Sequence, residues 1–133
     1  MINPTGDLDS DGITNDVDTD IDGDGYTNAA DAFDYDGTEW TDTDSDGIGN
    51  NADTDDDGDG ICDTAAVDVG VCFNGPDDFP LDSTESWDAD GDGFGHNADA
   101  DDDGDGIDDW QDTDDDGDGE ADATDAFPNN YNV

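Results

Sequence analysis

The chain has 133 residues, of which 44 are acidic and none is lysine or arginine, so its formal net charge is −44. Only 29% of the residues are hydrophobic, which is too few for a conventional core, and composition alone predicts disorder. The lack of cationic side chains excludes nucleic acid as a partner, and no apolar run approaches the roughly 20 residues that insertion of a membrane-spanning helix requires.

The aspartates follow a repeated pattern, which argues against a solvated, disordered tail. The pattern D-x-D-x-D-G begins at seven places: Asp7, Asp20, Asp42, Asp55, Asp88, Asp101 and Asp114. Neighbouring copies within a group begin 13 residues apart. Each loop is numbered here from its first aspartate, so that positions 1, 3 and 5 are Asp and position 6 is Gly in all seven loops.

In chain order, these loops and the stretches between them divide the sequence into six segments. We expect an N-terminal segment with a first loop pair over 1–31, an aromatic connector over 32–41, a second loop pair over 42–65, a cysteine-bounded insertion with a second aromatic connector over 66–87, a third group of three loops over 88–125, and an unfinished connector or assembly tail over 126–133.

The spacing within a loop suits a hard cation such as Ca²⁺, which takes about six to eight oxygen ligands. Side chains at positions 1, 3 and 5 can converge only if the backbone wraps around the ion, and glycine at position 6 permits the sharp bend. Position 7 would offer its backbone carbonyl, position 9 would coordinate directly or through water, and position 12 would close the shell. Position 12 is Asp in six loops and Ala66 in the fourth, and position 7 is apolar or aromatic except at Glu120.

The loop resembles the calcium loop of EF-hands, but position 12 is Asp, and a 13-residue step leaves no room for the flanking helices. The closer resemblance is to thrombospondin type 3 repeats and their bacterial relatives, through strings such as DTDDDGDG and DAFP, over about residues 7–65 and 78–128. Repeats of that family are aspartate-rich loops wound around many Ca²⁺ ions. The resemblance therefore implies an irregular, metal-organised repeat array with little regular secondary structure, drawn out into an elongated rod.

The resemblance also implies the residues that would bind about seven or more calcium ions. They are those at positions 1, 3, 5, 7 and 12, with Asp63 at position 9 included in the fourth loop. The predicted ligands are Asp7, Asp9, Asp11, Ile13 and Asp18; Asp20, Asp22, Asp24, Tyr26 and Asp31; Asp42, Asp44, Asp46, Ile48 and Asp53; Asp55, Asp57, Asp59, Ile61 and Asp63; Asp88, Asp90, Asp92, Phe94 and Asp99; Asp101, Asp103, Asp105, Ile107 and Asp112; and Asp114, Asp116, Asp118, Glu120 and Asp125.

The chain has two cysteines, Cys62 and Cys72, which bracket the start of the insertion. We expect an intramolecular disulfide, which stabilises by about 2–3 kcal/mol when it closes a small loop. The alternative is a pair of thiol metal ligands, for which this spacing without a nearby histidine suits zinc poorly. A disulfide indicates an oxidising, extracellular or cell-surface location.

The connectors that begin at Phe33 and Phe79 are similar in sequence, and each places its phenylalanine nine residues before the next loop. We interpret them as turns that dock aromatic side chains onto neighbouring loops. The alternative is a sugar-stacking platform made by the three tryptophans, Trp40, Trp87 and Trp110. The single histidine, His96, occupies a position 9, and we interpret it as a substitute for asparagine there rather than as a catalytic base.

The sequence ends in what reads as the start of another connector, from Phe127 to Val133. We expect either neighbouring repeats in a longer chain or head-to-tail self-association of subunits. The leading functional hypothesis is a calcium-stiffened rod, spacer or filament subunit that folds on binding Ca²⁺. A calcium-dependent adhesion module that recognises a protein or glycan is the alternative, and an acidic ion reservoir is a third. No nucleophile–base pair or pocket-forming core is recognisable, so we do not expect an enzyme.

Overall fold

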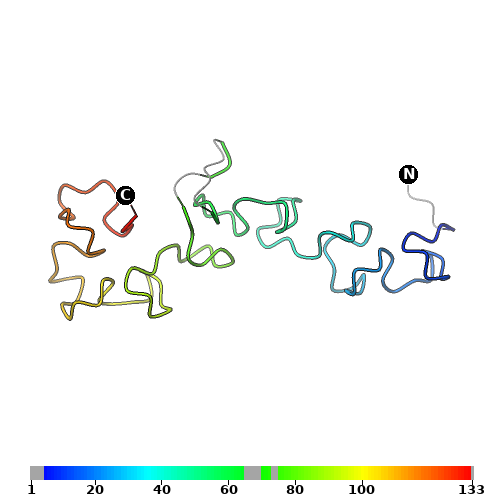
Figure 1. Cartoon of the computed structure of the whole chain (residues 1–133), viewed down its shortest axis with the longest axis horizontal. Coiled ribbons are helices and arrows are strands. Elements are labelled where there is room, and N and C mark those ends of the chain that lie inside the picture. Colours follow the sequence, from blue (N-terminus) through cyan, green and yellow to red (C-terminus); the bar gives the residue numbers. More distant parts are fainter. Residues whose placement is uncertain (1–4, 65–69, 73–74, 133) are drawn as a thin grey trace. The chain divides into compact units, whose positions relative to one another are not determined.

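The structure is a computed structural model, and it describes residues 5–64, 70–72 and 75–132. Throughout these residues the backbone forms turns and bends, with no helix and no strand, as the cartoon in Figure 1 shows. This confirms the expectation of an irregular chain. Parts of the predicted segments 1–31, 42–65, 66–87 and 126–133 fall outside the described residues.

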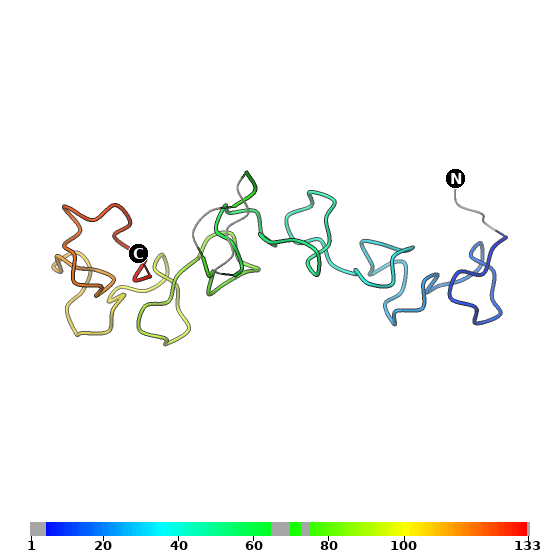
Figure 2. The same cartoon turned by 45° about the horizontal axis from the view of Figure 1, so that its top comes forward.

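The chain divides into two compact units, Met1–Asp56 and Asp57–Val133. Each unit is a succession of small loops, which can be followed by colour in Figures 1 and 2. The first three predicted loops lie in the first unit, and the fifth, sixth and seventh lie in the second. The fourth loop contains the division between the units, which falls between Asp56 and Asp57.

Two recurrent backbone hydrogen bonds close the loops. In at least six loops the N–H at position 9 donates to the carbonyl of the residue that precedes the loop, as Asn28 does to Thr19 at 2.9 Å. In at least five loops the N–H at position 12 donates to the carbonyl at position 8, as Asp99 does to Gly95 at 2.9 Å. Two of the backbone N–H groups that a helix or sheet would pair are therefore paired locally in most of the loops.

The side chain at position 9 fastens the loop from within. In at least five loops its oxygen accepts the N–H at position 2, as Asn28 Oδ1 accepts the N–H of Ile21 at 3.0 Å and Asp109 Oδ1 accepts that of Asp102 at 2.9 Å. This bond joins position 2 to position 9, so it holds the beginning of the loop, with its first aspartate, close to the end, with its last. Both asparagine and aspartate can supply the acceptor, which explains why both occur at this position.

Position 4 shows how consecutive loops of one group touch. Its φ is positive in every loop, including +67° at Ser10 and +74° at Gly23. A Cβ added to Gly23 would lie 2.7 Å from the Cβ of Asp9, which is position 3 of the preceding loop. Ser10 belongs to the first loop of its group, where no preceding loop approaches. The contact therefore explains why serine is found at position 4 only in leading loops.

The two connectors fold alike around a buried glutamate. Glu39 lies eight residues after Asp31, and Glu85 lies eight residues after Asp77. Each glutamate accepts a backbone N–H through Oε2. The donors are Asn51 at 3.0 Å and Asn97 at 2.9 Å. Charged side chains thus occupy interior positions that apolar side chains fill in ordinary domains.

Aromatic side chains of the connectors pack on the next or preceding loop, as the sequence predicted. Trp40 stacks on Tyr26 with ring centroids 5.2 Å apart and planes 5° apart. Trp87 packs on His96 with centroids 5.6 Å apart. Among the described residues, buried hydrophobic side chains are confined to Ile21, Cys62 and Cys72, so these aromatic pairs supplement a very small apolar core.

Candidate metal centres

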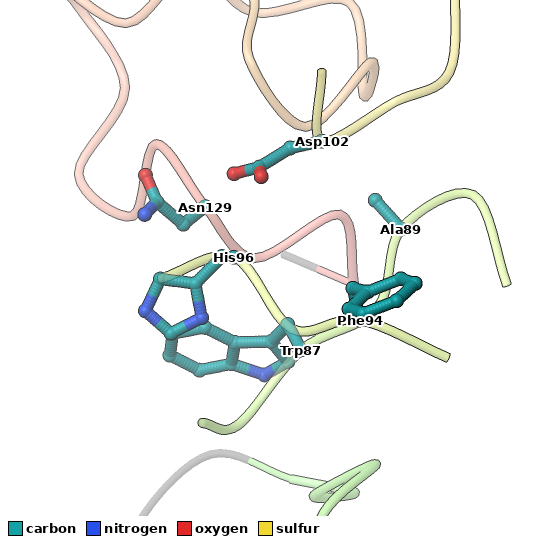
Figure 3. A pocket seen from close by; sticks show the side chains of 6 residues that line it. All are labelled: Trp87, Ala89, Phe94, His96, Asp102 and Asn129. Carbon is teal, nitrogen blue, oxygen red and sulfur yellow. The ribbon is translucent and has the colours of Figure 1, made fainter. Parts of the chain in front are cut away.

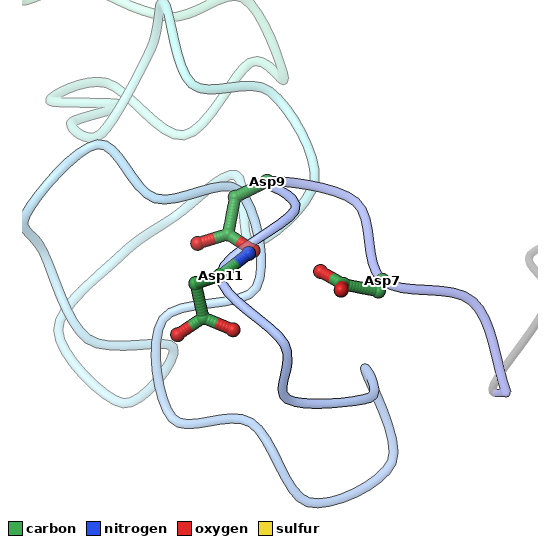
Figure 4. Close-up of side chains that lie close together, drawn as sticks. All are labelled: Asp7, Asp9 and Asp11. Atoms are coloured by element: carbon green, nitrogen blue, oxygen red, sulfur yellow. The ribbon is translucent and has the colours of Figure 1, made fainter.

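Aspartates at positions 1, 3 and 5 come together in space. In several loops each of the three offers a carboxylate oxygen, and these oxygens all lie within 4.8 Å of one another. The clusters include Asp7, Asp9 and Asp11; Asp20, Asp22 and Asp24; Asp42, Asp44 and Asp46; and Asp88, Asp90 and Asp92. Figure 4 shows the first of them: Asp9 and Asp11 lie close together, and the Asp7 carboxylate points toward them. Each cluster could hold a metal ion.

Backbone hydrogen bonds fix the orientation of these carboxylates. At position 3, Asp22 Oδ1 accepts the N–H of Asp24 at 3.3 Å, and at position 5, Asp24 Oδ1 accepts the N–H of Tyr26 at 2.7 Å. At position 1, Asp42 Oδ2 accepts the N–H of Gly47 at 3.2 Å. One oxygen of each carboxylate is therefore engaged by the loop, and the other is held in a defined direction.

Several of the remaining oxygens are buried and accept no hydrogen bond. They occupy positions 1, 3, 5 and 12 of the loops, and they are Asp42 Oδ1, Asp22 Oδ2, Asp24 Oδ2, Asp116 Oδ2, Asp18 Oδ2 and Asp125 Oδ2. A buried anionic oxygen without a partner is strongly unfavourable. A cation held between these oxygens would remove that cost, and their chemistry suits a hard metal ion.

The carboxylate at position 12 belongs to the same electrostatic cluster as positions 1, 3 and 5. Burial raises the pKa of Asp22, a hydrogen bond from Asp24 opposes the rise, and the charges of Asp24, Asp31 and Asp20 add to it. In the seventh loop burial again raises the pKa of Asp116, and the charges of Asp118, Asp125 and Asp114 contribute. The residues at position 12 in these two loops are Asp31 and Asp125.

The sixth and seventh loops repeat the same backbone bonds, with the N–H of Ile107 on Asp105 at 2.9 Å and that of Glu120 on Asp118 at 2.6 Å. The carbonyl role predicted for position 7 and the ligand role predicted for Asp63 stay predictions. Because the fourth loop holds the division between the units, Asp55 stays a prediction as well.

Asp102 is a buried carboxyl that the ligand prediction did not include. It is 7% exposed, and Oδ1 has no hydrogen-bond partner. Burial, together with the charges of Asp109, Asp99, Asp115 and Glu85, raises its pKa to about 7. Position 2 is also aspartate at Asp56 and Asp115, so the sequence carries no signal that singles out Asp102.

Asp102 lines a narrow pocket with Trp87, Phe94 and His96 among others. Figure 3 shows the His96 ring lying over Trp87, with Asp102 facing them. His96 Nδ1 is 3.9 Å from Glu85 Oε2. The backbone of His96 keeps the loop-closing bond, donating to the Trp87 carbonyl at 3.1 Å, as the other residues at position 9 do. Its side chain packs on the connector instead of bonding across the loop.

The predicted disulfide is present. Cys62 and Cys72 are bonded, ten residues apart, and both are fully buried. A disulfide is consistent with an extracellular location. In the described part of the chain, no helix has the length and apolar character required to cross a membrane.

Comparison with known proteins adds no assignment. A scan against models of protein families found no match, and a search of curated proteins found none either.

Proposed function

We propose that this chain is an extracellular structural protein, a calcium-stiffened rod, spacer or filament subunit that becomes ordered when Ca²⁺ binds. The observation that carries the proposal is the convergence of the carboxylates at positions 1, 3 and 5, together with buried carboxylate oxygens without hydrogen-bond partners at positions 1, 3, 5 and 12. The resemblance to thrombospondin type 3 repeats supports the same function.

Charge neutralisation supports the coupling of calcium to folding. With a formal charge of −44 and almost no apolar core, the compact chain experiences strong self-repulsion unless cations bind. Seven Ca²⁺ ions would bring the charge to −44 + 14 = −30. Binding free energy then becomes folding free energy, as in other small domains organised by metal.

The ligand chemistry favours calcium over other divalent ions. The candidate sites offer carboxylate oxygens, with a carbonyl predicted at position 7, and no thiolate or imidazole joins the clusters named above. Mg²⁺ requires compact octahedral geometry and loses its water reluctantly, whereas Ca²⁺ accepts seven or so oxygens in flexible geometry. Calcium in the millimolar range outside cells is sufficient for sites of about 10⁻⁴–10⁻³ M affinity.

Contacts between consecutive loops support a structural role. Within a group, position 4 of one loop packs against position 3 of the loop before it, at Gly23 on Asp9 and at Gly117 on Asp103. Units that contact mainly their sequence neighbours build elongated objects. Their stiffness would depend on every loop being loaded with its ion.

One observation favours a second function, calcium-dependent adhesion to a protein or glycan. Trp110 is 78% exposed, and its Nε1 donates to Asp108 at 2.9 Å, which holds the ring at the surface. An exposed, oriented indole can stack on a sugar or fill a pocket of a partner. An adhesion module should show a saturable ligand, whereas a spacer or filament should order with Ca²⁺ alone.

The deciding experiment measures size and mass by small-angle and static light scattering, first in Ca²⁺ and then in chelator. We expect an expanded monomer in chelator and a defined thin rod, or a growing polymer, in Ca²⁺. The mass separates a spacer from a filament subunit. A chain that is equally expanded in both conditions would refute the structural proposal and favour an ion reservoir.

A further inference from the structure

The fourth loop lacks the residue that would close its metal site. Position 12 is Ala66, which has no side-chain oxygen, whereas the other six loops have aspartate there. Residues 66–76 form an insertion relative to the first connector, and Asp77 follows it. Asp77 precedes Asp88 by 11 residues, the same interval that separates Asp31, a residue at position 12, from Asp42.

The backbone of Asp77 makes the hydrogen bond that characterises position 12. Its N–H donates to the carbonyl of Cys62 at 3.0 Å, and Cys62 is position 8 of the fourth loop. The same bond from position 12 to position 8 has lengths of 2.9–3.1 Å in other loops, for example from Asp112 to Asp108. After the insertion, the backbone of Asp77 therefore occupies the place that position 12 has in the other loops.

The side chain of Asp77 is also oriented as a residue at position 12. Its Oδ1 accepts the N–H of Phe79, two residues ahead, at 2.7 Å. Asp31 and Asp125 accept the N–H of the phenylalanine two residues ahead at 2.7 and 2.8 Å. In Asp77 and Asp125 the second carboxylate oxygen, Oδ2, is buried and accepts no hydrogen bond.

Asp77 is buried among the acids of the fourth loop. It is 6% exposed, and Oδ2 has no hydrogen-bond partner. Burial is the main cause that raises its pKa to about 7; the bond from Phe79 opposes the rise, and the charges of Asp59, Asp57 and Asp63 contribute to it. Asp57 is position 3, and in the second and seventh loops the charge at position 12 likewise acts on the aspartate at position 3.

Two features tie the insertion to the loop beside Asp77. The disulfide joins Cys72 to Cys62, the residue whose carbonyl receives the Asp77 N–H. Gly75 has φ +139°, and a Cβ there would lie 2.5 Å from the carbonyl oxygens of Cys62 and Thr64. Gly75 is two residues before Asp77, and only glycine lets the chain pass so close to the loop at this point.

We propose that Asp77 is the closing carboxylate of a cation site in the fourth loop, with Asp57 and Asp59, and that it takes the place of Ala66 across the disulfide-tied insertion. This inference rests on the proposed function, because it assumes that the loops bind Ca²⁺. On this inference, residues 66–76 are inserted between position 11 and the closing carboxylate, and the metal site keeps its full set of ligands.

The test is a Ca²⁺ titration of the full chain followed by amide NMR signals, with those of Gly60 and Ile61 reporting on the fourth loop and those of Gly106 and Ile107 on the sixth. Asp77→Asn should raise the Ca²⁺ concentration required at the fourth loop by about tenfold or more and leave the sixth unchanged. Asp82→Asn is the matched control, since Asp82 is exposed and caps a connector turn, and it should change neither.

A second variant decides the matter if Asp77→Asn fails to fold. Deleting residues 66–76, with Cys62→Ser, makes Asp77 the twelfth residue of an uninterrupted loop. This variant should bind Ca²⁺ at the fourth loop, and Asp77→Asn added to it should abolish that binding.

Unchanged binding at the fourth loop in Asp77→Asn would overturn the inference. If the deletion variant binds equally with and without Asp77→Asn, the inference is also wrong. Should no loop respond to Ca²⁺, the proposed function itself fails, which is distinguishable because the sixth loop reports independently of Asp77.

Discussion

Replacing Gly104 by alanine tests whether consecutive loops depend on one another. Gly104 is position 4 of the sixth loop, with φ +69°, and Gly91 is position 4 of the fifth, with φ +78°. A Cβ on Gly104 would lie 2.6 Å from Asp90 Oδ2 and 3.0 Å from Asp90 Cβ, whereas a Cβ on Gly91 meets nothing within 4 Å. The pair therefore separates backbone strain from contact between loops.

The magnitudes follow from these distances. An alanine in the left-handed region costs about 1–2 kcal/mol at either site. At Gly104 overpacking adds roughly 1–3 kcal/mol, because Asp90 cannot move freely. Its Oδ1 accepts the N–H of Asp92 at 3.0 Å, so displacing the carboxylate breaks that bond and disturbs the predicted ion site of the fifth loop.

Urea unfolding at saturating Ca²⁺ measures the difference in the free energy of unfolding between the variants. The amide signals of Phe94 and Ile107 then report Ca²⁺ binding at the fifth and sixth loops. Gly104→Ala should weaken both loops, and Gly91→Ala should weaken only the fifth. Equal destabilisation by the two variants, or an undisturbed fifth loop in Gly104→Ala, would refute the contact between loops.

Three further predictions concern the ions directly. Asp46→Ala should raise the Ca²⁺ concentration required by the third loop by about tenfold, while Ser45→Ala should change it little; equal affinities in a calorimetric titration would contradict the ligand assignment. Burial and neighbouring charges raise the pKa of Asp77 and Asp102 from 3.8 to about 7. The ion-free compact chain should therefore be most stable below pH 3.8 and lose that stability as the pH rises through about 7. Ca²⁺ binding near pH 6.5 should then release protons, which calorimetry in two buffers of different ionisation enthalpy measures; no buffer dependence would be inconsistent with these shifts. Mg²⁺ at equal concentration should leave the chain largely expanded in small-angle scattering, and full ordering by Mg²⁺ would rule out calcium selectivity.

Much of the local organisation could be read from residue order. The convergence of Asp7, Asp9 and Asp11 follows from their alternation and from the glycine at position 6, because all of the contacts involved are short in sequence. The irregular backbone follows from the shortage of apolar residues. With two cysteines in the chain, the pairing of Cys62 with Cys72 required no structural information.

Features that depend on the path of the chain between loops required the tertiary structure. By sequence position the fourth loop ends at Ala66, whereas the backbone places Asp77, which follows the insertion 66–76, beside Cys62. Counting also gives no sign that Gly104 touches Asp90.

The burial of individual acidic side chains also required the tertiary structure. Among many similar acids, the sequence marks those at ligand spacing, but it does not distinguish Asp102 and Glu85, which are buried, from Asp82, which is exposed. Spacing determines which carboxylates of one loop can meet, because that depends on local backbone geometry. Which carboxylates lose their water is decided only when separate loops and connectors pack, and that packing is set by contacts distant in sequence.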